Sequence, residues 1–76
     1  MRIRVTLHSG LRRRLPPDLQ GQTEFDLPEG GTLADLALRL SMTDVVYAIG
    51  GSLERDWTRH LRDGDEVDVF VPAAGG

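Results

Sequence analysis

The chain has to fold with 76 residues and without a single cysteine. A domain of this size buries only about 60% of the surface that its unfolded chain exposes, so its stability depends on efficient packing. Disulfides and thiolate metal sites are excluded because both need cysteine. We therefore expect one small domain with a single core and no second lobe that carries a separate active site.

The composition is that of an ordinary globular domain, with 39% hydrophobic and 28% charged residues. No apolar run reaches the 18 or more residues of a membrane span. The net charge of -3 comes from twelve acidic and nine basic residues, all of the latter arginine, and predicts neither a nucleic-acid nor a membrane partner. The N-terminus lacks an apolar signal segment, which together with the missing cysteines favours the cytoplasm.

Two segments in the first third of the chain alternate between apolar and polar residues. Residues 1–8 and 23–27 each have the period of two that is typical of a half-buried strand, and the inward positions are Ile3, Val5, Leu7, Phe25 and Leu27. Residues 11–15, followed by two prolines, are too short for a stable helix, so we expect a long loop pinned by its two leucines. The two strands should form a hairpin.

A helix is predicted to begin after Thr32, since Thr32 and Asp35 have the spacing of a capping box. It should run for about three turns with one apolar face, formed by Leu33, Leu36, Ala37 and Leu40.

The second half of the chain contains two further strand patterns. Residues 45–49 are β-branched and aromatic, and residues 66–71 alternate with their valines inward after the turn at 63–65. Between them, residues 52–61 suit a helical turn or an irregular segment. Its Trp57 is expected to cover one end of the sheet, so that Trp57→Ala would cost about 3–5 kcal/mol, with an exposed partner anchor as the alternative.

This order of elements predicts an α+β domain in which one main helix packs on one face of a small mixed sheet. The first and last strands can lie side by side in parallel. Arg2 and Arg4 would then face acidic residues on both neighbouring strands, namely Glu24, Asp26, Glu66 and Asp68.

The sequence offers no catalytic constellation and no metal site. His8 and His60 lack the spacing of metal ligands, and His8 next to Ser9 on a strand does not align the imidazole with the hydroxyl. The arginines at 12–14 could grip an anionic ligand or an acidic partner, although a solvated loop is the favoured interpretation. We therefore expect a protein that is not an enzyme by itself.

A docking surface is predicted on the sheet face that the helix leaves open. If the valines of the last strand point inward, Phe70 must point outward, and Val46 and Ala48 do the same on the third strand. Together with Pro72, which precedes the tail, these residues form the predicted partner-binding set.

The chain ends in Gly75 and Gly76. A dipeptide without side chains can thread a narrow channel with its carboxylate leading, so an enzyme could activate that carboxylate deep in its own active site. A frayed terminus is the alternative interpretation.

The segment LRDGDEVDVFVPAAGG, residues 61–76, resembles the C-terminal signature of the ubiquitin-like sulfur carriers, the family of the molybdopterin synthase small subunit and the thiamine-biosynthesis carrier (MoaD/ThiS). Residues 31–36, GTLADL, resemble the start of the family's helix. The chain departs from the pattern at Gly50-Gly51, where many members have Asn-Gly, and in the short connection at 41–44. The resemblance implies a ubiquitin-like β-grasp domain over residues 1–72 and a flexible tail over 73–76.

The resemblance also implies a function. The Gly76 carboxylate would be adenylated by an E1-like adenylyltransferase and converted to a thiocarboxylate, with Gly75 and Gly76 as the reactive tail and no proteolytic maturation. ATP and the sulfur donor would act through that partner, and the chain would bind no cofactor of its own. A sulfur-accepting synthase subunit would be the second partner. The favoured product is molybdopterin or tungstopterin, and thiamine thiazole or thiolated tRNA are the less favoured ones. A ubiquitin-like modifier that forms isopeptides and a non-catalytic interaction module remain the alternatives.

Overall fold

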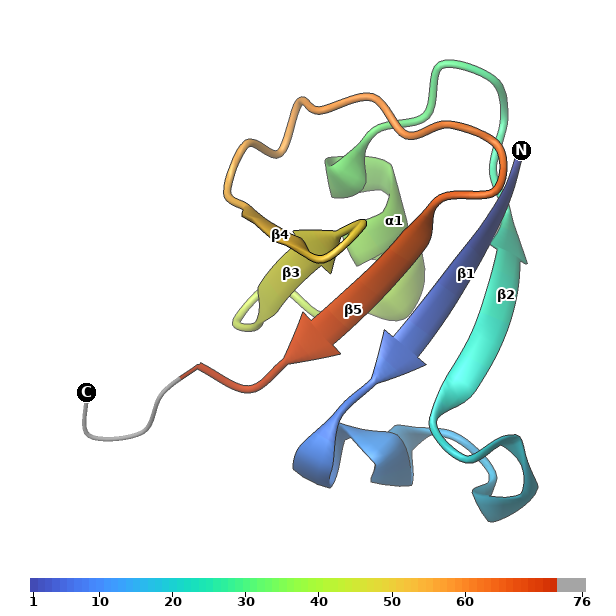
Figure 1. Ribbon diagram of the computed structural model, residues 1–76, viewed down its shortest axis with the longest axis vertical. Helices are drawn as coiled ribbons and strands as arrows, with labels where there is room; N and C mark the ends of the chain where they lie inside the picture. The colour runs from blue at the N-terminus through green and yellow to red at the C-terminus, as the bar shows by residue number, and fades with distance from the viewer. Residues whose placement is uncertain (73–76) are drawn as a thin grey trace.

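The structure is a computed structural model that describes residues 1–72. A five-stranded mixed sheet carries one α-helix on one face (Figure 1). The strands are β1 (Arg2–Leu7), β2 (Gln22–Asp26), β3 (Val46–Ile49), β4 (Ser52–Glu54) and β5 (Glu66–Phe70), and the helix is α1 (Leu33–Leu40). Two short 3₁₀-helices, η1 (Ser9–Arg14) and η2 (Pro17–Leu19), connect β1 to β2. The expected α+β class is confirmed. The expected tail at 73–76, with Gly75 and Gly76, lies outside the described residues.

The strand order is β2-β1-β5-β3-β4, with β1 and β5 parallel and the other pairs antiparallel. This confirms both the predicted hairpin of the first two strands and the parallel pairing of the first strand with the last. Alternation within each strand separates a core face from an open face. The core face meets α1 in one cluster, whose fully buried members include Ile3, Val5, Leu7, Leu33, Leu36, Tyr47, Val67 and Val69.

Helix α1 begins with the predicted capping box. The Thr32 hydroxyl accepts from the Asp35 backbone N–H at 3.4 Å, and the Asp35 carboxylate accepts from the Thr32 N–H at 2.8 Å. The helix has eight residues, about two turns, and so is shorter than the three turns expected. It ends because Ser41 adopts a left-handed conformation, with φ at 56°, and its N–H caps the carbonyls of Ala37 and Leu38.

The strand β4 was missed in the sequence. Gly50 and Gly51 form a two-residue turn with φ at 57° and 87°, and both values favour glycine. The chain therefore reverses directly and pairs residues 52–54 with β3, so the expectation of a helical turn or irregular segment is wrong there. Only the remainder, up to Leu61, is irregular.

The connection between β1 and β2 contains no α-helix, as expected, and Leu11 pins it to the core. Its backbone closes tightly at Gly21. A Cβ at Gly21 would lie 2.7 Å from the Leu7 carbonyl oxygen, which explains why a glycine stands there.

Strand β5 ends one residue earlier than predicted. Its last pairing is Phe70 with Val46, the first residue of β3, and beyond that point the sheet offers no partner. Val71 therefore leaves the sheet and is 51% exposed, so its assignment to the inward face is wrong.

Among residues 1–72, no helix is long and apolar enough to cross a membrane.

Candidate functional site

The open face of the sheet has an aromatic pair beside the end of β5. The register of β1 and β5 pairs Leu7 with Val69, and the His8 N–H donates to the Val69 carbonyl at 3.0 Å. The imidazole of His8 consequently stacks on the Phe70 ring, with centroids 4.5 Å apart and planes 8° from parallel. Its Nε2 also lies 2.8 Å from the Asp68 carboxylate. Phe70 points outward as predicted, held flat against a polar neighbour.

Strand β3 adds the apolar neighbours of Phe70. The register pairs Val46 with Phe70 and Ala48 with Asp68, so the three predicted docking residues of the open face do lie together. Ala48, however, is only 4% exposed and offers a partner almost no surface. The residue opposite Ala48 on β4, Leu53, is 63% exposed and supplies that surface instead. We call Phe70, Val46, Ala48 and Leu53 the apolar half of the open face.

Leu53 was not recognised in the sequence as part of this face. The signal that could have found it is the Gly50-Gly51 dipeptide. After a two-residue turn the chain returns as an antiparallel strand. The second residue after the turn then pairs with the second residue before it.

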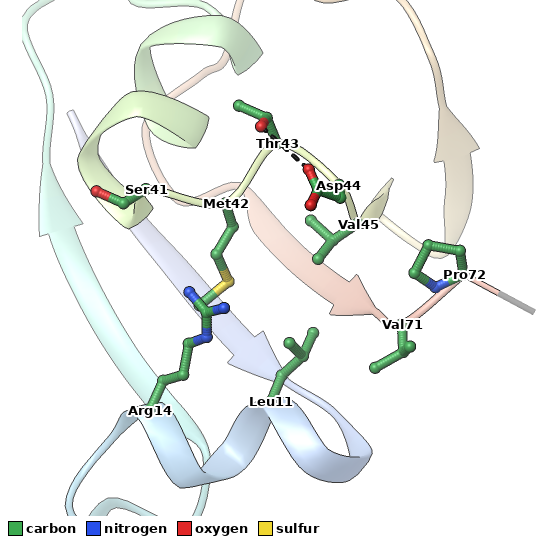
Figure 2. A pocket seen from close by; sticks show the side chains of 9 residues that line it. All are labelled: Leu11, Arg14, Ser41, Met42, Thr43, Asp44, Val45, Val71 and Pro72. Atoms are coloured by element: carbon green, nitrogen blue, oxygen red, sulfur yellow. Dashed lines mark hydrogen bonds between the residues drawn. The ribbon is translucent and has the colours of Figure 1, made fainter. Parts of the chain in front are cut away.

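Pro72, the last described residue before the tail and called here the root of the tail, lies at the edge of this apolar half. Pro72 is exposed and lines two depressions. One, of about 530 Å³, separates it from Leu53 and Trp57. The other, of about 280 Å³, lies between η1 and the chain that enters β3 (Figure 2). The predicted set of Phe70, Val46 and Pro72 is thus contiguous along the path from β5 to the tail, whose Gly75 and Gly76 lie beyond the described range.

Strands β1 and β2 carry the other half of the open face, which is charged. Arg2 lies 3.8 Å from Glu24 and 3.5 Å from Asp26, and Arg4 lies 3.8 Å from Glu24 and 3.6 Å from Glu66. The predicted pairings are confirmed for these carboxylates. We call this set the charged half.

The fourth expected carboxylate, that of Asp68, does not belong to the charged half. The parallel register places Glu66 opposite Arg4 and moves Asp68 up to Thr6, within reach of His8. The expectation that Asp68 would flank the arginines is therefore wrong.

Trp57 lies at the far edge of the sheet and is 40% exposed. Its ring meets Tyr47 edge to face, with centroids 5.7 Å apart and an interplanar angle of 73°. Trp57 was expected to cover one end of the sheet, with an exposed partner anchor as the alternative; the structure lies between the two, because the indole contacts Tyr47 but keeps 40% of its surface exposed.

The loop after β4 is fixed by charged hydrogen bonds. The guanidinium of Arg59 donates to Glu54 at 2.8 Å and lowers the pKa of that carboxyl. The hydroxyl of Thr58 donates to Asp56 at 2.6 Å and lowers its pKa in the same way. These bonds favour the ionised carboxylates and hold the loop in which Trp57 is placed.

The two histidines are far apart in the fold. His8 meets Asp68 and Phe70 on the open face, whereas Nδ1 of His60 lies 3.0 Å from the Gly30 carbonyl next to the start of α1. In the part of the chain that the structure describes, no three histidine or carboxylate side chains gather as a metal site would require.

No protein-family model matches the chain, and no curated protein sequence matches it as a relative. Solved structures do resemble it. A protein assigned as molybdopterin converting factor subunit 1 from Pyrococcus furiosus is 25% identical, with a TM-score of 0.79, 96% of this chain and 99% of that chain being covered. SAMP1 from Haloferax volcanii is 14% identical with a TM-score of 0.76, and both chains are covered completely.

A third structure contains a partner. It is the complex of subunits 1 and 2 of the molybdopterin-converting factor from Helicobacter pylori, 17% identical with a TM-score of 0.71 and complete coverage of both chains. The five-stranded mixed sheet with one main helix is therefore the ubiquitin-like β-grasp fold. The neighbours also support the resemblance to the MoaD/ThiS family of sulfur carriers.

Proposed function

We propose that this chain is a sulfur carrier whose Gly76 carboxylate is adenylated, converted to a thiocarboxylate and then used to donate sulfur. One observation carries the proposal. Strand β5 holds Phe70 on the open face, and the chain reaches Pro72 two residues later and Gly76 six residues later, so the docking surface and the reactive group are on one continuous segment. The similarity to molybdopterin converting factor subunit 1 supports the same reading.

The chemistry explains why a carrier of this kind needs a partner enzyme. A carboxylate is a poor electrophile, so an oxygen of the Gly76 carboxylate first attacks the α-phosphorus of ATP and releases pyrophosphate. The sulfur of a donor then attacks the acyl carbon, and AMP departs with the electron pair of the broken C–O bond. With a persulfide as donor the product is an acyl disulfide; a thiol then attacks the donor's sulfur, forms a disulfide with it and releases the thiocarboxylate, a nucleophilic sulfur, with the electron pair of the broken S–S bond. ATP and the donor belong to the partner, and the chain acts as a co-substrate rather than as an enzyme.

Two partners follow from this proposal. An E1-like adenylyltransferase activates the carboxylate, and a sulfur-accepting synthase subunit receives the sulfur. The complex of subunits 1 and 2 from Helicobacter pylori supports the second partner. Because the activation step consumes ATP, the cytoplasm is the proposed location. The favoured product is the dithiolene of molybdopterin or tungstopterin, ahead of thiamine thiazole and thiolated tRNA.

The decisive experiment is intact-mass measurement after incubation with an E1-like adenylyltransferase, ATP and a sulfur source. We expect the chain to gain the mass difference between sulfur and oxygen. A variant that lacks Gly76 and a variant extended beyond Gly76 should gain nothing while keeping the thermal melting curve of the original chain, because the core is complete without these residues.

Two outcomes would contradict the proposal. A truncated chain that still acquires sulfur would remove Gly76 from the reaction. Isopeptide conjugates on lysines of other proteins, with no thiocarboxylate formed, would assign the chain to the ubiquitin-like modifiers instead.

A further inference from the structure

Three consecutive arginines, Arg12, Arg13 and Arg14, lie on η1 at the end of the sheet where β5 finishes. All three are exposed, and within residues 1–72 none of them forms an ion pair or a side-chain hydrogen bond. Arg2, Arg4 and Arg59 differ, since each is paired with a carboxylate. The basic charge at the root of the tail is therefore not neutralised by neighbouring side chains.

The arginines are held in place by the fold. Leu11, between them and β1, is buried in the core, and the N–H of Leu15 donates to the Arg12 carbonyl at 3.2 Å. The Arg12 side chain lies across Gly21, where a Cβ would meet its Cγ at 3.0 Å. Presenting them to a partner thus costs less conformational entropy than ordering a free loop.

Arg14 forms one wall of the depression at the root of the tail. Figure 2 shows its side chain extending from η1 towards Met42, with Leu11 on the same side and Val71 and Pro72 opposite. Asp44 lies at the rim, where its carboxylate accepts from the Thr43 hydroxyl at 3.3 Å. At about 280 Å³ the depression is smaller than typical small-molecule sites and suits one or two side chains of a protein.

We propose that this depression, with Arg14 at its wall and Arg12 and Arg13 beside it, binds an acidic segment of the adenylyltransferase. An apolar side chain of that segment would enter between Leu11 and Val71, and a neighbouring Asp or Glu would face the guanidinium of Arg14. The inference rests on the proposed function, because Pro72 also lines the depression beside Val46 and Leu53 of the apolar half. The net charge of -3 argues against nucleic acid as the occupant.

The test uses Arg14→Glu, with Arg62→Glu as its matched control. Both residues are exposed and both changes alter the net charge equally, but Arg62 lies next to the turn before β5, at the opposite end of that strand. We expect Arg14→Glu to slow association with the purified adenylyltransferase about tenfold at low salt, measured by stopped-flow fluorescence. The difference should shrink as salt is added, and Arg62→Glu should associate within about twofold of the original chain.

The results distinguish a failure of this inference from a failure of the proposed function. Equal slowing by both variants would reduce the effect to net charge and overturn the inference, while adenylation of the original chain would leave the proposed function standing. An original chain that neither binds the enzyme nor is adenylated overturns both. Thermal melts of the two variants check that both remain folded. We expect unchanged melting curves because both side chains are exposed.

Discussion

The two halves of the open sheet face differ in whether their exposed side chains already have partners within the chain. In the charged half, Arg2 and Arg4 on β1 are paired with carboxylates of the two neighbouring strands, β2 and β5, so each charge already has its partners. In the apolar half, Phe70 and Leu53 remain in contact with solvent, although His8 stacks on one side of the Phe70 ring. In one half of the open face the charges are already paired in water. In the other half, covering the surface with a partner would be favourable because it removes apolar side chains from water.

The path of the chain after β5 connects this difference with the proposed function. Strand β5 belongs to both halves, since Glu66 at its start pairs with Arg4 and Phe70 at its end lies over Val46. The chain leaves the sheet from the apolar end. Under the proposed function, a partner that covers the apolar half would also contact Pro72, whereas a partner on the charged half would have to break ion pairs.

The largest effect is expected beneath the apolar half, at Tyr47. Its hydroxyl donates to the Met42 carbonyl at 2.6 Å, and burial raises its pKa to about 12 from the usual value near 10. The folded chain keeps the phenol protonated where the unfolded chain ionises it. The free energy of unfolding should therefore be unaffected below pH 10 and fall by up to about 3 kcal/mol as the pH rises towards 12.

Urea unfolding from pH 8 to pH 12 measures this loss without interference from other side chains. The sequence has one tyrosine, no lysine and no cysteine, so no other side chain titrates mainly in that interval. Tyr47→Phe should start from a somewhat lower stability, because the Met42 carbonyl loses its donor, and should then stay level. A parallel decline in both proteins would remove Tyr47 as the cause.

The next effect separates the halves directly. Phe70→Ala should weaken binding to the adenylyltransferase by about 1–3 kcal/mol, as the loss of an interface aromatic does. Its cost in stability should be about 1–2 kcal/mol, below that of a buried phenylalanine, since the ring is already 36% exposed and its stacking partner is on the surface. Titration calorimetry and thermal melts measure the two quantities.

The matched control for Phe70→Ala is Arg4→Ala in the charged half, which should leave affinity within about twofold. If Phe70→Ala instead lowers stability as a core deletion does and leaves affinity untouched, the docking surface lies elsewhere on the molecule.

Much of the fold could be predicted because each strand repeats a pattern of period two. Ile3, Val5 and Leu7 define the inward face of β1 unambiguously, and Thr32 with Asp35 marks the start of α1. The strand β4 is only three residues long, too short for alternation to reveal it. The end of α1 before the connection at 41–44 could also be placed, but not the left-handed conformation in which Ser41, although not a glycine, ends the helix.

The candidate site was predictable only as far as it depends on one strand at a time. Alternation along β5 places Phe70 outward. The contact of His8 with Phe70 depends on the register of β1 against β5, which joins residues about 60 positions apart and is set by packing of the whole core. The place of Leu53 in the apolar half likewise depends on its pairing with Ala48, and the sequence did not place Leu53 on a strand.

Trp57 tests how firmly the apolar half is supported at its outer edge. Its indole is 40% exposed and contacts Tyr47 through one edge, so Trp57→Ala should cost about 1–2 kcal/mol, less than the loss of a buried tryptophan. Chemical unfolding monitored by circular dichroism measures the loss. Leu38→Ala, on the exposed side of α1, is the control and should cost less than about 0.5 kcal/mol. A cost of 3 kcal/mol or more at Trp57 would mean that the ring closes the core after all.

The smallest effect is expected in the charged half, and it decides whether that half is structural. Arg4 is 57% exposed and lies 3.8 Å from Glu24 and 3.6 Å from Glu66, distances at which exposed pairs contribute only about 0.2–1 kcal/mol. Arg4→Gln should therefore lower the free energy of unfolding by no more than about 1 kcal/mol, and the loss should diminish as salt screens the pairs. Arg13→Gln removes the same charge from an arginine without an ion pair in residues 1–72 and should change stability less. If Arg4→Gln were as costly as a core deletion and insensitive to salt, the ion pairs would be holding β1 between its neighbours, and the charged half could no longer be regarded as a surface that is merely satisfied in water.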